Sequence, residues 1–253
     1  MACIRQEVRD GIAVVTIDNP ARRNAFTAAM TRALGQALEA AEADDAVRCV
    51  VLTGEGDAAF SSGHDIAEML EDREGASDPA LNAPFVRPES MLTPVIAAVN
   101  GPALGAGFIL ALACDLRVCA ENASFTAPGA RIGLLPVGGQ ISRLPGLVPP
   151  AVAYDMMASC RALGAEEAHR YGFAGRLAPR GGALAEALRW AGQIAANSPS
   201  VVRAVKAGLR VGRTGGHAAA DAYEWRVARE LQDGPDAREG LEAFLEKRPA
   251  RFS

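Results

Sequence analysis

The chain has 253 residues, of which 49% are hydrophobic and 22% are charged, so it can form an ordered domain with a sizeable core. The formal net charge of −4 argues against nucleic-acid binding, because such binding depends on clustered basic residues that neutralise phosphates. Neither the five cysteines nor the three histidines have the spacing of a zinc or redox site, so we expect no metal and free thiols.

Short apolar strands alternate with turns and helices along the first part of the chain. Strands are predicted at residues 12–17, 47–52, 95–99, 116–120 and 124–126. A helix is predicted from Thr27, because apolar residues recur after it at intervals of three and four. The last two strands follow each other closely, so the repeating unit is nearer to strand–strand–helix than to strict alternation. We therefore predict an α/β fold wound as a spiral of short sheets.

The two remaining segments differ in composition. Residues 68–89 are charged and interrupted by Gly and Pro, which predicts a mobile surface loop that acts as a lid. After Ser198 and Pro199 the apolar residues keep helical spacing to the end of the chain. We therefore predict a core formed by residues 1–195 and a helical region formed by residues 196–253.

The sequence also carries predictions about location. Its first residues contain no basic stretch followed by an apolar stretch, so we expect no secretory signal and a cytoplasmic protein. The most apolar run, residues 103–114, is shorter than the ~20 residues that a membrane-spanning helix needs. We expect this run to be a core helix and expect no membrane partner.

Two glycine-containing loops follow predicted strands. In the first, FSSGHD at 60–65, Gly63 would let a ligand approach the backbone closely. The second, NGPALGAG at 100–107, leads into a helix whose first amides lack partners and attract negative charge. Taken alone, each loop is weak evidence for a ligand site, because glycine-rich turns between strands and helices are more often packing devices. The glycine spacing does not match the dinucleotide fingerprint, and neither a G-x-S-x-G elbow nor a P-loop lysine is present.

Together the two loop regions resemble a known family. The segments SSGHDIAEM and PVIAAVNGPALGAGFILALACDLRVCAENASFTAP resemble the two signature regions of the crotonase (enoyl-CoA hydratase/isomerase) superfamily. The resemblance continues through IGLLPVGGQISRLPGLV and ALGAEEAHRYGFAGRLAP to EGLEAFLEKRPARF. It implies a spiral of ββα turns with a C-terminal helical region that drives assembly into trimers or dimers of trimers. It also implies an acyl-CoA ligand and no separate cofactor.

The resemblance implies a role for each site residue. The backbone amides of His64 and Ala106 correspond to the family's oxyanion hole, which stabilises the charge of a thioester enolate. The implied substrate-binding residues are Arg22, Arg23, Ala25, Gly63, Asp65, Ile66, Gly105, Ile109, Gly129, Val137, Phe244 and Lys247. Phe244 and Lys247 match positions that cover the site of a neighbouring subunit.

The chain departs from the family at the acid–base positions. Ile109 and Gly129 occupy the positions of the two hydratase glutamates, and Val137 occupies a position where some dehalogenases and dienoyl isomerases have an aspartate. None of the three can transfer a proton, so we expect very slow hydration of crotonyl-CoA. The nearest titratable group that could replace these acids is the side chain of His64. In the alternative interpretation, only the backbone amide of His64 is functional.

Further candidates leave the chemistry open. Glu68, Glu71 and Asp72 in the predicted lid are possible acids or bases, and Arg131 is either a surface residue or the partner of a substrate carboxylate. Two classes of protein remain. The first is an enzyme with isomerase, decarboxylase, hydrolase or atypical lyase chemistry. The second is a non-catalytic protein that binds acyl-CoA in an apolar pocket.

Overall fold

The computed structural model describes residues 2–71 and 78–252. Its larger sheet has the strand order β1-β2-β3-β4-β6-β9, and its smaller sheet has the order β5-β7-β8. The strands are β1 (Cys3–Arg9), β2 (Ile12–Asp18), β3 (Cys49–Gly54), β4 (Val95–Val99), β5 (Ala103–Leu104), β6 (Leu116–Ala120), β7 (Ser124–Thr126), β8 (Leu163–Gly164) and β9 (Arg176–Ala178). From β2 to β9 the larger sheet is parallel, whereas β1 pairs antiparallel with β2.

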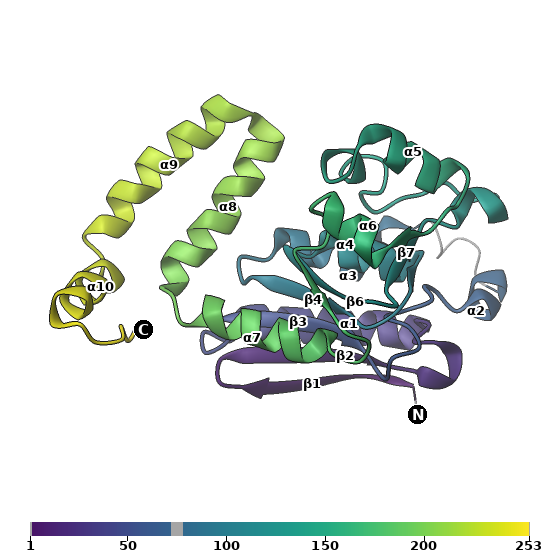
Figure 1. The fold of residues 1–253 in the computed structure, drawn as a ribbon, viewed down its shortest axis with the longest axis horizontal. Coiled ribbons are helices and arrows are strands. Elements are labelled where there is room, and N and C mark those ends of the chain that lie inside the picture. Colours follow the sequence, from purple (N-terminus) through teal and green to yellow (C-terminus); the bar gives the residue numbers. More distant parts are fainter. Residues whose placement is uncertain (1, 72–77, 253) are drawn as a thin grey trace.

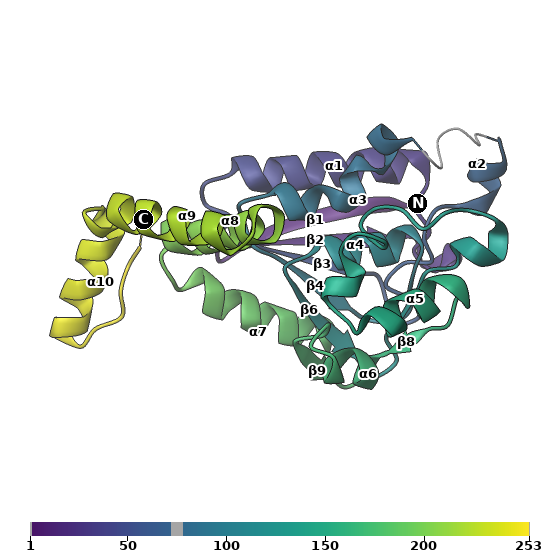
Figure 2. The same cartoon turned by 90° about the horizontal axis from the view of Figure 1, so that it is seen from above.

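Helices cover both faces of the larger sheet (Figures 1 and 2). The helices are α1 (Ala28–Ala43), α2 (Ile66–Glu71), α3 (Pro79–Ser90), α4 (Ala106–Ala113), α5 (Pro150–Ala158), α6 (Ala165–Arg170), α7 (Ala183–Ala195), α8 (Pro199–Gly215), α9 (His217–Gln232) and α10 (Pro235–Glu246). Successive residues of β2 point to opposite faces. Val15 and Ile17 join the core shared with α1, α3 and α4, whereas Ile12 joins the core beneath α7. The predicted α/β spiral is confirmed.

The first hairpin was not predicted, although the sequence carries its signal. Asp10 and Gly11 link β1 to β2 with φ values of 51° and 74°. An Asp-Gly pair with two positive φ angles is typical of the tight turn between antiparallel strands. The strand β3 also begins and ends two residues later than predicted, at Cys49–Gly54.

The prediction of a surface loop at residues 68–89 is wrong for the part that the structure describes. Glu68 to Glu71 belong to α2, and Asp78 caps α3 by accepting a hydrogen bond from the Ala80 amide at 2.8 Å. The side chain of Phe85 is fully buried and packs edge-to-face on Phe26, with ring centroids 4.8 Å apart. This burial stabilises the helix even though Pro84 and Pro88 lie inside it and lower its helical propensity. Residues 72–77 lie outside the described part of the chain.

The helices α8, α9 and α10 project away from the sheet (Figures 1 and 2). The carboxylate of Asp236 joins the start of α10 to the start of α8, since the Ser198 and Ser200 hydroxyls lie 2.6 and 2.8 Å from it. Several large apolar side chains of these helices are exposed: Val201, Val205, Leu209, Trp225, Leu241, Phe244 and Leu245. No described helix is both long and apolar enough to cross a membrane.

The five cysteines are all free. Burial raises the pKa of the Cys49, Cys114 and Cys119 thiols to about 12. These three thiols are therefore protonated at neutral pH and act as small apolar side chains.

Candidate active site

The two glycine-containing loops lie side by side. The Leu104 amide donates to the Ser61 carbonyl at 2.9 Å, and the Phe60 amide donates to the Pro102 carbonyl at 3.0 Å. Ser61 and Ala103 also form an isolated parallel bridge. The strands β3 and β4 are neighbours in the sheet, so their carboxyl ends bring the two loops together.

Glycines allow this close approach. A Cβ atom on Gly63 would lie 3.0 Å from the Leu104 oxygen and 3.3 Å from the Ala106 amide nitrogen. Gly63 also has a φ of 96°, which favours glycine. A Cβ atom on Gly107, at the start of α4, would lie only 2.6 Å from the Ser61 oxygen. The loops can therefore lie this close together only because glycine has no side chain.

Both predicted oxyanion-hole amides are free of protein acceptors within the described residues. The residues on either side of His64 form hydrogen bonds with Phe26. The Phe26 amide donates to the Gly63 carbonyl, and the Asp65 amide donates to the Phe26 carbonyl, each at 2.8 Å. In such a parallel bridge, the amide of His64 itself points away from Phe26. Ala106 is the first residue of α4, where amides have no partner within the helix.

These amides border a cavity of about 130 Å³. Eight of the predicted site residues line it: Gly63, His64, Ile66, Gly105, Ala106, Ile109, Gly129 and Val137. Its wall also includes Asn82 of α3 and Gln140, which were not predicted from the sequence. Exposed apolar side chains, among them Ile132 and Leu135, complete the lining. The cavity therefore combines an apolar wall with a few polar groups, as is typical of small-molecule sites.

The side chain of His64 is held in one orientation by Asn82. The Asn82 side-chain nitrogen donates to the Asp78 carbonyl at 2.9 Å, which leaves its Oδ1 facing His64 Nε2 at 3.1 Å. Nε2 must therefore carry the hydrogen, and in the neutral ring Nδ1 is the basic atom. Among the described residues Nδ1 has no hydrogen-bond partner. Burial lowers the pKa of His64 despite the opposing effect of Asn82, so the neutral ring is favoured.

Four other predicted substrate-binding residues lie in or beside the first loop and do not line the cavity: Arg22, Arg23, Ala25 and Asp65. The Arg22 guanidinium forms an ion pair with Asp65, and the Ser62 amide donates to the Arg23 carbonyl at 3.0 Å. Burial alone would raise the pKa of Asp65, but Arg22 and the Ala67 amide bring it below its ordinary value. Ala25 is buried, whereas both arginines are exposed.

The three positions where the chain lacks an acidic residue differ in the space they offer to a larger side chain. Ile109 is 4% exposed and fills the cavity wall, and Val137 is 41% exposed at its edge. A Cβ atom on Gly129 would lie 2.3 Å from the Leu134 carbonyl oxygen. A glutamate therefore cannot be placed at residue 129 unless the turn to Leu134 moves. No carboxylate of the described residues lines this cavity.

The remaining candidates lie elsewhere or have other partners. Glu68 accepts a hydrogen bond from the Ala28 amide at 2.7 Å and so caps α1, while Asp72 lies outside the described residues. Glu71 and Arg131 are exposed and do not line the cavity. Phe244 and Lys247 belong to α10 and its end, on the opposite side of the molecule from α2 (Figures 1 and 2). Within one chain they are far from the loops.

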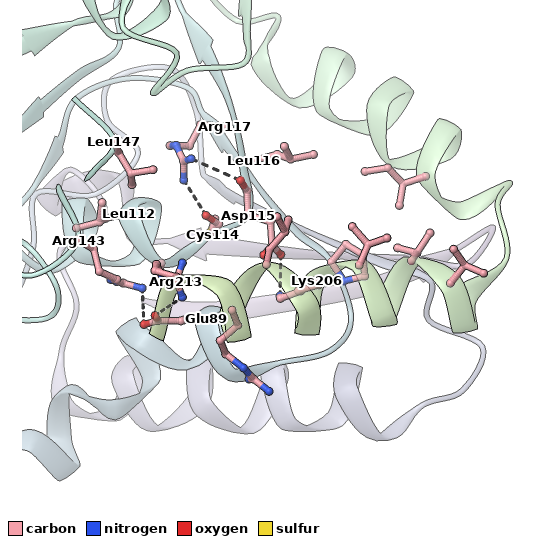
Figure 3. A pocket seen from close by; sticks show the side chains of 18 of the residues that line it. Glu89, Leu112, Cys114, Asp115, Leu116, Arg117, Arg143, Leu147, Lys206 and Arg213 are labelled. Carbon is pink, nitrogen blue, oxygen red and sulfur yellow. Dashed lines mark hydrogen bonds and ion pairs between the residues drawn. The ribbon is translucent and has the colours of Figure 1, made fainter. Parts of the chain in front are cut away.

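A larger cavity of about 790 Å³ lies between α8 and the core (Figure 3). Two ion-paired groups line it, because Glu89 pairs with Arg143 and Arg213, and Lys206 pairs with Asp115 at 2.7 Å. Neither glycine-containing loop contributes to it. We therefore place the candidate active site at the smaller cavity, which both glycine-containing loops border.

Comparisons with known proteins agree with this fold. The family model for enoyl-CoA hydratase/isomerase matches residues 7–253. A carnitinyl-CoA dehydratase from Salmonella typhi is 36% identical over 242 residues, which cover 92% of each chain. The chain belongs to the enoyl-CoA hydratase/isomerase family, which is the crotonase superfamily predicted from the sequence.

Solved structures support the same assignment. A probable enoyl-CoA hydratase/isomerase from Mycobacterium abscessus is 37% identical, with a TM-score of 0.91 and coverage of 100% of this chain and 99% of that one. An enoyl-CoA hydratase from Bacillus anthracis is 28% identical, with a TM-score of 0.94 and coverage of 98% of each chain. The whole fold is therefore shared, including the C-terminal helices.

Proposed function

We propose that the protein is an enzyme that binds an acyl-CoA thioester and stabilises its enolate between the amides of His64 and Ala106. The observation that carries this proposal is that two amides border one cavity and have no acceptor in the described part of the chain. Two such donors, fixed before the substrate arrives, stabilise a developing negative charge by several kcal/mol. The wider family relationship supports acyl-CoA as the ligand.

The proposed base is Nδ1 of the neutral His64 ring. It takes a proton from the carbon beside the thioester carbonyl, and the electron pair of that C–H bond moves onto the carbonyl oxygen. The two amides then hold the enolate. Return of the proton to the same carbon regenerates the thioester, and in an unsaturated chain its return to a carbon further along shifts the double bond. This transfer needs no metal or nicotinamide.

We favour proton transfer within the substrate over hydration. One base that accepts and returns a proton is sufficient for a double-bond shift, whereas the family's hydration uses two glutamates. Ile109 and Gly129 stand at those two positions, and no carboxylate of the described residues lines the cavity. The relative named carnitinyl-CoA dehydratase points instead to water elimination. Elimination also begins from the proton beside the thioester, so enolate formation is the step common to both reactions.

The test is exchange of the C2 protons of butyryl-CoA with deuterium, followed by NMR in heavy water. This exchange reports enolate formation without assuming a net reaction. We expect His64→Ala, which keeps the backbone amide, to slow exchange by roughly 10²–10⁴-fold. His217→Ala, at an exposed position on α9, should leave the rate unchanged.

Two results would contradict the proposal. Unchanged exchange in His64→Ala would exclude the ring as the base. Absence of exchange in the wild type, with saturated, 2-enoyl and 3-enoyl thioesters alike, would favour the second class of protein, a non-catalytic acyl-CoA-binding protein. The apolar wall formed by Ile109 and Val137 is the feature that would suit that role.

We also propose that the protein assembles in multiples of three. The helices α8, α9 and α10 expose apolar side chains that a monomer would leave in water. Assembly through these helices would bury them, and it would give Phe244 and Lys247 a neighbouring site to cover. The resemblance to trimeric family members is the second argument for this proposal.

A further inference from the structure

One face of the helix α3 contacts the proposed base. Asn82, Phe85 and Glu89 follow one another at intervals of three and four residues, which places them on the same face of a helix. The Asn82 Oδ1 atom lies 3.1 Å from His64 Nε2, and the Phe85 ring packs edge-to-face on the His64 ring with centroids 5.1 Å apart. Two of the three residues on this face therefore hold the imidazole ring.

The third residue of this face, Glu89, is bound to Arg143. One carboxylate oxygen of Glu89 pairs with the guanidinium of Arg143, whose side chain is only 10% exposed. The other oxygen pairs with Arg213 of α8 at 2.6 Å (Figure 3). Because both oxygens are engaged in charge-assisted bonds, the carboxylate holds the Arg143 guanidinium in one orientation.

Arg143 in turn supports a glycine turn in the wall of the candidate active site. Its second terminal nitrogen donates to the Gly138 carbonyl at 3.2 Å. Gly138 has a φ of 64°, and a Cβ atom on it would lie 2.5 Å from Ile109 Cγ2, so the turn packs directly on this cavity residue. Val137 and Gln140, which flank the turn, line the same cavity as His64. The guanidinium and Ile109 therefore fix the position of this part of the wall.

We propose that Arg143 is a positioning residue that, through Glu89 and α3, sets the distance between the His64 ring and the cavity wall at Val137 and Gln140. Arg143 does not itself line this cavity, so it acts through other residues. Nδ1 can take a proton only from a carbon held within its reach, and a misplacement of about 1 Å can cost roughly 10²-fold in rate. This inference rests on the proposed function, because it requires His64 to be the base.

The test is Arg143→Met, with the C2 exchange rate and the affinity for butyryl-CoA measured separately. Methionine removes the guanidinium but keeps an unbranched side chain, and Glu89 keeps Arg213 as its partner. We expect exchange at saturating butyryl-CoA to slow by at least about tenfold, because the ring and the wall are no longer held together.

The affinity distinguishes positioning from a general loss of structure. We expect the dissociation constant of butyryl-CoA to change by less than about threefold, because hydrogen bonds between the two loops fix the oxyanion-hole amides. The calorimetric stoichiometry gives the folded fraction, so the exchange rate can be expressed per folded molecule. A purely structural role would leave that corrected rate unchanged.

Arg161→Met is the matched control. Arg161 also joins two carboxylates, those of Asp155 at 2.6 Å and Glu167 at 2.8 Å, but these belong to α5 and α6. We expect this variant to exchange at the wild-type rate.

The outcomes separate this inference from the proposed function. An unchanged corrected rate in Arg143→Met, or an equal slowing in Arg161→Met, would overturn the inference and leave the proposed function intact. Absence of exchange in the wild type would overturn both. If Arg143→Met does not fold, Arg143→Lys decides the question, because lysine keeps the charge but lacks the fork of donors that reaches both Glu89 and the Gly138 carbonyl. We expect Arg143→Lys to exchange more slowly than wild type, and exchange at the wild-type rate would overturn the inference.

Discussion

The two glycine-containing loops and the three C-terminal helices are held in place in opposite ways. Phe60, Ser61 and Ala103 in the loops are fully buried, and hydrogen bonds within the chain fix the distance between the loops. By contrast, no residue of α8 or α9, both of which the structure describes completely, is fully buried. The chain therefore determines the geometry of its own candidate active site, whereas its C-terminal helices still present surface for another molecule to cover.

The largest expected effect comes from breaking the contact between the loops. Gly107→Ala would place a Cβ atom 2.6 Å from the Ser61 oxygen, so the loops must separate. We expect the free energy of unfolding to fall by about 2–3 kcal/mol and acyl-CoA binding to be lost. Urea denaturation and calorimetry measure the two effects.

The matched control for this variant is Gly192→Ala on α7. A Cβ atom at this exposed helical position would meet nothing within 4 Å. We expect the free energy of unfolding to stay the same or to rise by about 0.5–1 kcal/mol, because alanine favours a helix over glycine. Equal effects of the two substitutions would show that the contact between the loops is not tight.

A change of assembly is expected from polar substitutions on the C-terminal helices. Leu241→Asp combined with Leu245→Asp places charges on exposed apolar positions of α10. We expect light scattering to show a wild-type mass that is a multiple of three chains and a smaller mass for the variant. Val8→Asp, at an exposed position on β1, should keep the wild-type mass. A wild type that stays monomeric at micromolar concentration would contradict the proposed assembly.

A smaller effect is expected from pH. Burial lowers the pKa of His64 below its ordinary value of 6.5, so the unfolded chain binds the proton at this residue more readily than the folded protein does. The stability linked to His64 is therefore present above pH 6.5 and is lost as the pH falls toward the lower, folded pKa. The C2 exchange rate should likewise persist from pH 7.5 to 6.5 and fall only below that range. A midpoint above pH 6.5 would contradict a buried neutral base.

Much of the core was predictable because its signals are local. The β-branched runs of β2 and β4 predict strands, and the residues of both glycine-containing loops could be matched to the family. The helix α3 could not be predicted, because its stability comes from burial of Phe85 against distant residues. Because this helix was not predicted, the role of Asn82 was not predicted either. Asn82 lies on α3 and orients His64, which is 18 residues earlier in the sequence.

Two further features could not be predicted from the sequence: the lack of space at Gly129 and the buried oxygen of Gln140. Gly129 could be seen to lack a carboxylate, but its contact with the Leu134 carbonyl depends on the path of the backbone. Gln140 has no signal in the sequence, because a glutamine there is compatible with an exposed loop. Only the structure shows that its oxygen is buried and has no hydrogen-bond partner among the described residues.

The central claim is that two amides receive the thioester carbonyl, and affinity for matched ligands tests it most directly. Butyryl-CoA and S-butyl-CoA have the same chain, but the second is a thioether and has no carbonyl. If the amides of His64 and Ala106 bind the oxygen, calorimetry should show butyryl-CoA binding at least about tenfold more tightly. Equal affinities for the thioester and the thioether would contradict the account.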